Sequence, residues 1–168
     1  AGHSETLIGK AITDFDRSKL FITTKVSRRH HHYKDVLVSA HGSLARLGTS
    51  YLDLYLLHAP SSEIPFRDTF QAMNELVEKK LVRFIGVSNF TAAQLEQAKQ
   101  YSRYPITCNQ IHYSLSARDY ERDGTLEYCR AQEILIVAYR AMGDAGTPAE
   151  GWNLLELMAK KYQSRLEM

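Results

Sequence analysis

Apolar segments of β type alternate with amphipathic helical segments along the chain, and this alternation restricts the fold more than any other feature. The apolar runs predict strands at 19–26, 51–58, 82–90, 106–114 and 133–143. Apolar spacings of three and four predict helices at about 33–47, 66–81, 91–101, 126–131 and 152–162. Strands that are apolar on both faces and recur at roughly 30-residue intervals, with helices between them, form covered parallel sheets. The sequence therefore predicts an α/β fold, either a doubly wound sheet or a (β/α)8 barrel.

Length, charge and cysteine content exclude several classes of protein. The 168 residues suit a single domain, and a net charge of +2 is too small to indicate nucleic acid or an anionic membrane as the main partner. No apolar run approaches the roughly 20 residues that span a bilayer, and the N-terminus lacks the pattern of a secretory signal. Cys108 and Cys129 are far apart and form no CxxC pair. We therefore expect a reduced, cytoplasmic protein with two buried thiols.

Polar or aromatic side chains recur near the carboxyl ends of the five predicted strands. They are Lys25, His58, Ser88 with Asn89, Gln110 and Tyr139. Ligands bind at this edge of the sheet in both candidate architectures. Each residue alone has an ordinary explanation, such as a solvated lysine, a hydrogen-bonded core histidine or a turn residue. Their recurrence on one rim favours a barrel mouth, where side chains converge from all sides.

Six sequence blocks, spread over nearly the whole chain, resemble the aldo-keto reductase family in order and spacing. They are GHSETLIGKAI, KLFITTKV, SLARLGTSYLDLYLLHAP, LVEKKLVRFIGVSNF, CNQIHYS and IVAYRAMG. The resemblance implies a (β/α)8 TIM barrel, which usually takes about 250 residues. Residues 1–168 would then form a single partial barrel domain of about five βα units, corresponding to strands 3 to 7.

The resemblance implies an oxidoreductase that uses NADPH (NADP) to reduce aldehyde or ketone carbonyls to alcohols. Lys25 matches the family's lysine, whose charge would lower the pKa of a neighbouring tyrosine phenol. His58 matches the histidine that orients the substrate carbonyl and shares its developing negative charge. Both residues are therefore expected to be catalytic.

The resemblance also implies a set of cofactor contacts. The matching residues are Ser88, Asn89, Gln110, Tyr139, Arg140 and Met142. The first three would hold the nicotinamide carboxamide, and the nicotinamide ring would stack on Tyr139. Arg140 and Met142 match positions where the chain passes the cofactor pyrophosphate. No GxGxxG motif occurs, and the family does not need one because its cofactor does not bind on a Rossmann unit.

The family pattern extends beyond both ends of the given sequence. Its catalytic tyrosine and aspartate precede the block matched by AGHSE, and its eighth strand, with the site for the adenosine 2′-phosphate, follows KKYQSRLEM. We expect a longer polypeptide. There are two alternatives. The chain is a truncated fragment, or a second copy completes the sheet at its unpaired edges. The function classes left open are therefore the reductase, an NADPH-binding regulatory module and an inactive fragment.

The tract His30–His32 raises the question of a metal site. Adjacent residues point in different directions on any regular element, and no acidic or cysteine partner lies at a ligand spacing. The tract is therefore predicted as a loop, with no metal. The expected partner is a small carbonyl substrate, with no nucleic acid or membrane, and oligomers would form through unpaired strand edges.

Overall fold

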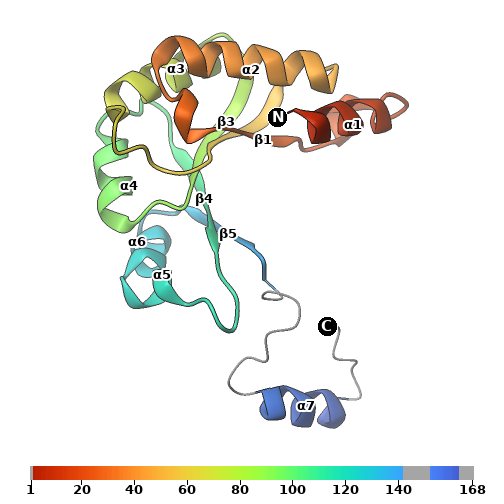
Figure 1. The fold of residues 1–168 in the computed structure, drawn as a ribbon, viewed down its shortest axis with the longest axis vertical. Coiled ribbons are helices and arrows are strands. Elements are labelled where there is room, and N and C mark those ends of the chain that lie inside the picture. The colour runs from red at the N-terminus through yellow and green to blue at the C-terminus, as the bar shows by residue number, and fades with distance from the viewer. Residues whose placement is uncertain (1, 142–151, 163–168) are drawn as a thin grey trace.

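A computed structural model describes residues 2–141 and 152–162 and contains one five-stranded parallel sheet (Figure 1). The strands are β1 (Thr23–Val26), β2 (Leu52–Leu57), β3 (Val82–Ser88), β4 (Ile106–His112) and β5 (Leu135–Tyr139). They lie side by side in the order of the sequence, and every pair is parallel. A doubly wound sheet reverses its strand order at a switch point, whereas a barrel keeps the sequence order. The predicted α/β class is confirmed, and the strand order is that of a barrel.

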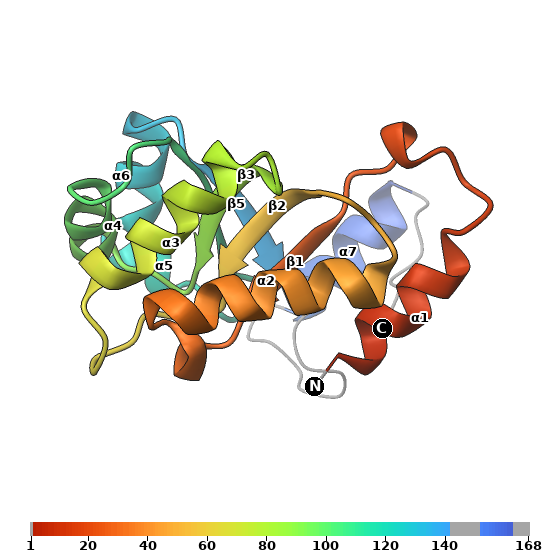
Figure 2. The ribbon, with the colours of Figure 1, turned by 90° about the horizontal axis from the view of Figure 1, so that it is seen from above.

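The helices that precede β5 in the sequence follow the outside of the curved sheet (Figures 1 and 2), whereas the last helix lies apart from the sheet in Figure 1. They are α1 (His3–Ala11), α2 (Tyr33–Leu47), α3 (Phe66–Glu78), α4 (Ala92–Lys99), α5 (Asp119–Arg122), α6 (Thr125–Ala131) and α7 (Trp152–Lys161), with 3₁₀ turns at Arg17–Lys19 and Arg28–His30. No helix within the described ranges combines the length and hydropathy needed to cross a bilayer.

The main hydrophobic core lies between the sheet and the helices that cover its outer face. It joins strand residues such as Tyr55 and Ile85 to helix residues such as Val36, Phe70 and Leu95. The inner face of the sheet carries a smaller buried cluster, formed by Leu54, Leu56 and Cys108. Several large apolar side chains of the inner face are exposed, namely Phe21, Phe84, Leu135 and Val137. The helix-covered face therefore supplies most of the packing.

The structure confirms two predicted helix boundaries and shows their physical cause. Gly48 ends α2 in the left-handed conformation, with a φ of 65°, which glycine adopts at little cost. Thr91 caps α4 in a capping box: its hydroxyl accepts from the Gln94 N–H, and the Gln94 side chain accepts from the Thr91 N–H. Both signals are local, which is why the sequence reveals them.

Several predicted elements were wrong in extent. The strand predicted at 19–26 begins only at Thr23, because a 3₁₀ turn occupies Arg17–Lys19. The strand predicted at 133–143 is β5, which ends at Tyr139. The helix predicted to Leu81 ends at Glu78, since Lys80 has a φ of 59° that no α-helix contains. The sequence reading also missed α1, in which no residue is buried, and the four-residue α5.

The histidine tract lies where the chain leaves β1 and enters α2. His30 ends a 3₁₀ turn, and His32 precedes the first residue of α2. The loop prediction holds for the path of the backbone but gave no indication that His31 is fully buried. Within the described part of the chain, no three His, Cys, Asp or Glu side chains gather as a metal site requires.

Candidate active site

Five of the predicted site positions lie at the carboxyl edge of the sheet. Ser88 is the last residue of β3 and is in register with Gln110 of β4, while Tyr139 is the last residue of β5. Lys25 lies one residue before the end of β1. His58 directly follows β2, and its N–H continues the ladder by donating to the Val26 carbonyl at 3.0 Å. The parallel sheet thus brings these residues to one rim, as the sequence predicts.

Asn89 connects this rim across several strands. Its backbone N–H donates to the Gln110 carbonyl at 2.9 Å, and its Nδ2 donates to the His58 carbonyl and to Ser88 Oγ, each at 3.1 Å. Its Oδ1 accepts from Tyr139 Oη at 2.9 Å. The φ of Asn89 is 60°, in the left-handed region that asparagine tolerates better than most residues. One side chain therefore ties together the ends of β2, β3 and β5.

The remaining hydrogen-bonding capacity of these groups fits a primary amide. Ser88 is almost fully buried, and its Oγ donates to the Gln110 carbonyl at 2.7 Å and accepts from Asn89 Nδ2 at 3.1 Å. A hydroxyl oxygen has two lone pairs, so one remains available. Asn89 uses both Nδ2 hydrogens but keeps a second lone pair on Oδ1. The half-buried Gln110 amide has no side-chain partner among the described residues. Two acceptors and an amide without a side-chain partner among the described residues therefore lie at the ends of adjacent strands.

Lys25 supplies a positive charge on the inner face of the sheet. It is in register with Leu56 and half-buried, and no acidic side chain in the described ranges forms an ion pair with it. It lies near the Cys108 thiol: burial raises the pKa of Cys108 to about 11, and the Lys25 charge opposes that rise only in part. Cys108 is thus an inert thiol at neutral pH, while the Lys25 ammonium is available to stabilise an anion.

Tyr139 is held by an aromatic neighbour that the sequence reading missed. The His112 imidazole stacks on the Tyr139 ring, with 5.4 Å between centroids and 16° between planes. The two residues are also register partners in β4 and β5. A signal was present, because His112 follows Gln110 by two residues, and alternate residues of a strand share a face.

Two of the predicted cofactor residues follow Tyr139. Arg140 is exposed and has a φ of 53°, so the chain turns sharply where β5 ends. Met142 lies outside the described residues. Their expected place beside the cofactor pyrophosphate stays a prediction.

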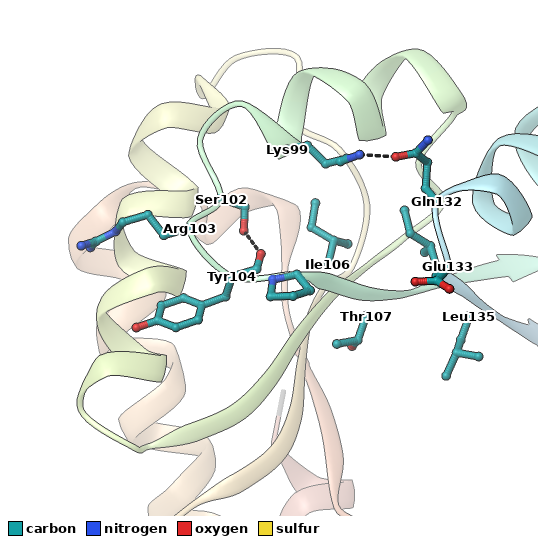
Figure 3. Close-up of a pocket in the computed structure, with 11 residues that line it drawn as sticks. Lys99, Ser102, Arg103, Tyr104, Ile106, Thr107, Gln132, Glu133 and Leu135 are labelled. Atoms are coloured by element: carbon teal, nitrogen blue, oxygen red, sulfur yellow. Dashed lines mark hydrogen bonds between the residues drawn. The ribbon is translucent and has the colours of Figure 1, made fainter.

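A pocket of about 580 Å³ lies at the opposite, amino end of the sheet (Figure 3). Its lining includes Ile106 and Leu135, the first residues of β4 and β5. Among its lining residues, Lys99 Nζ donates to Gln132 Oε1. None of the predicted site residues lines this pocket. It is therefore separate from the rim described above.

The parallel strands, in their sequence order, match those of a family of oxidoreductases. Residues 1–155 match the model of the Aldo/keto reductase family, and the chain belongs to that family. Its five parallel strands correspond to part of the (β/α)8 barrel found in those enzymes.

The individual relatives agree with this assignment. Methylglyoxal reductase YeaE of Escherichia coli is 34% identical over 151 residues, an alignment that takes in 89% of this chain and 52% of the relative. The thermostable aldo-keto reductase Tm1743, crystallised with the inhibitor epalrestat, is 44% identical with a TM-score of 0.95, over 98% of this chain and 60% of that one. An aldo/keto reductase from Klebsiella pneumoniae, crystallised with NADP and acetate, is 30% identical with a TM-score of 0.83, over 96% and 58%. The chain spans about half the length of the curated relatives it matches.

Proposed function

We propose that this chain provides the carboxamide-binding and carbonyl-orienting part of an NADPH-dependent reductase of aldehydes or ketones. The observation that carries the proposal is the meeting of Ser88, Asn89 and Gln110 at one rim, with a half-buried amide that has no side-chain partner among the described residues. A half-buried amide without a side-chain partner keeps its donor and acceptor available, and at a ligand-binding edge such a group can bind a polar ligand.

Each of these residues has a distinct part in holding the nicotinamide. The Gln110 amide would donate to the carboxamide oxygen, and the carboxamide N–H groups would donate to Ser88 Oγ and to Asn89 Oδ1. Tyr139 would supply an aromatic surface for the ring. When bound, NADPH supplies the hydride for the carbonyl carbon.

Two residues of this chain would act on the substrate. The exposed His58 imidazole would donate a hydrogen bond to the carbonyl oxygen and so share its developing negative charge. The Lys25 ammonium would lower the pKa of a phenol placed beside it and thereby help that phenol to release its proton. The tyrosine of the family pattern precedes the given sequence, so the proton donor is assigned to that pattern and not to a residue of this chain.

NADPH titration and carbonyl turnover together test the proposal, measured on a polypeptide that also contains the tyrosine and the adenosine site of the family pattern. Gln110→Ala should raise the dissociation constant for NADPH about two- to ten-fold, the equivalent of one hydrogen bond. Gln97→Ala is the matched control, since Gln97 is exposed on α4 and should leave the constant unchanged. His58→Ala should lower kcat by about a hundredfold with little effect on NADPH binding.

The outcomes separate the candidate functions. Absence of NADPH binding by the wild-type protein would overturn the proposal. Binding of NADPH without turnover of any aldehyde or ketone would favour the regulatory binding module. Equal losses of turnover and NADPH affinity in His58→Ala would mean that His58 is structural.

A further inference from the structure

We propose that His112 is a positioning residue that fixes the ring of Tyr139 as the stacking surface for the nicotinamide. The inference rests on the proposed function and extends it to a residue outside the set predicted from the sequence. It starts from the stack of the two rings, whose planes differ by only 16°. Such a stack is held by the two backbones as well, because His112 and Tyr139 are register partners in adjacent strands.

Tyr139 is therefore anchored at two points. The imidazole of His112 covers one face of the phenol ring, and the phenol Oη donates to Asn89 Oδ1 at 2.9 Å. Rotation of the tyrosine side chain about χ1 would break both contacts at once. Among the described residues, no other aromatic ring stacks on the second face of Tyr139. The arrangement holds the ring still and leaves one face for a ligand.

The anchor matters because Tyr139 is only partly buried. A partly exposed ring at the end of a strand would otherwise sample several rotamers, and the free-energy cost of ordering it on binding would reduce the affinity for the cofactor. The His112 stack orders the Tyr139 ring before the cofactor binds, so binding does not have to order it.

Variants of His112 separate positioning from structural effects. His112→Ala should raise the dissociation constant for NADPH about two- to ten-fold, the range that one aromatic pair contributes. His112→Phe keeps a ring at this position and should restore wild-type affinity. The dissociation constant for 2′,5′-ADP should not change in either variant, since that probe lacks the nicotinamide. His41→Ala is the matched control, because His41 is exposed on α2, on the helix-covered side of the sheet.

Ring resonances of Tyr139, observed by NMR with labelled tyrosine, give a readout that needs no cofactor. His112→Ala should shift these resonances, and His112→Phe should keep them under the ring current of a neighbour. Unchanged NADPH affinity in His112→Ala, or a gain in affinity, would overturn the inference; a gain would mean that His112 covers the face the nicotinamide uses. Equal weakening of 2′,5′-ADP would also overturn it. If the wild type does not bind NADPH, the proposed function is wrong. The NMR result is independent of that outcome, because unshifted Tyr139 resonances in His112→Ala would refute the positioning of Tyr139.

Discussion

Replacing His31 by leucine should stabilise the protein, and more so in mild acid. His31 is fully buried, and neither ring nitrogen has a hydrogen-bond partner in the described part of the chain. A neutral imidazole carries one donor and one acceptor, and leaving such buried groups unsatisfied costs about 1–3 kcal/mol. Leucine has a similar volume and no polar atom, so His31→Leu should raise the free energy of unfolding by about 1–3 kcal/mol at neutral pH.

The pH dependence follows from the pKa of His31. Burial lowers that pKa from 6.5 to about 4; the Val26 carbonyl lies near the ring without meeting hydrogen-bond geometry and opposes the shift only in part, and the nearby His30 adds to it. As the pH falls below about 6.5, the imidazole takes up a proton in the unfolded chain but not in the folded one until about pH 4. The wild type therefore loses stability across this window, by about 2 kcal/mol between roughly pH 7 and pH 5. His31→Leu should escape that loss.

Urea unfolding followed by circular dichroism at both pH values measures the difference. Carboxylates titrate in the same range, so the informative quantity is the wild-type value minus that of the variant at each pH. His41→Leu is the matched control, because the exposed His41 should give no such difference. Equal stability of wild type and His31→Leu at both pH values would refute the reasoning, since it would mean that the imidazole is satisfied or hydrated.

Two further substitutions test the packing of the central strands. Asp53 is fully buried and accepts hydrogen bonds from Arg17 and Arg83 at 2.7 and 2.8 Å. Asp53→Asn should therefore lower the free energy of unfolding by about 2–4 kcal/mol. A loss below about 0.5 kcal/mol, measured by urea unfolding, would contradict this prediction. Gly86 of β3 leaves no room for a methyl group, because a Cβ there would lie 2.9 Å from the Cys108 carbonyl oxygen. Gly86→Ala should therefore cost about 1–3 kcal/mol by overpacking, and an unchanged midpoint of thermal unfolding would argue against so tight an approach of the two strands.

Local patterns explain why the sequence predicts the sheet well. β2 is buried at every position, and its sequence is an apolar run that only Asp53 interrupts. The helix end at Gly48 and the helix start at Thr91 depend on residues only a few positions away. By contrast, α1 buries no residue and has few apolar positions, namely Leu7, Ile8 and Ala11, so its pattern is too short to stand out as a helix.

The site was only partly predictable, because its contacts join residues far apart in the sequence. The resemblance assigns Asn89 and Tyr139 separate roles, but the hydrogen bond between them spans 50 positions and depends on how the strand ends pack. The stack of His112 on Tyr139 likewise depends on the register of β4 and β5. The burial of His31 has the same origin, since it results from how the loop after β1 packs and not from its neighbours in the sequence.

The rim residues differ in how many side-chain contacts hold them. Asn89 bonds to the carbonyls of His58 and Gln110, which follow or belong to central strands of the sheet. Tyr139 has two side-chain anchors, the hydrogen bond to Asn89 and the stack on His112. Within the described residues, by contrast, no ion pair holds the Lys25 ammonium group. The residues assigned to the carboxamide are thus ordered by contacts with one another, whereas the lysine assigned to assist proton donation lacks an ion-pair partner among the described residues.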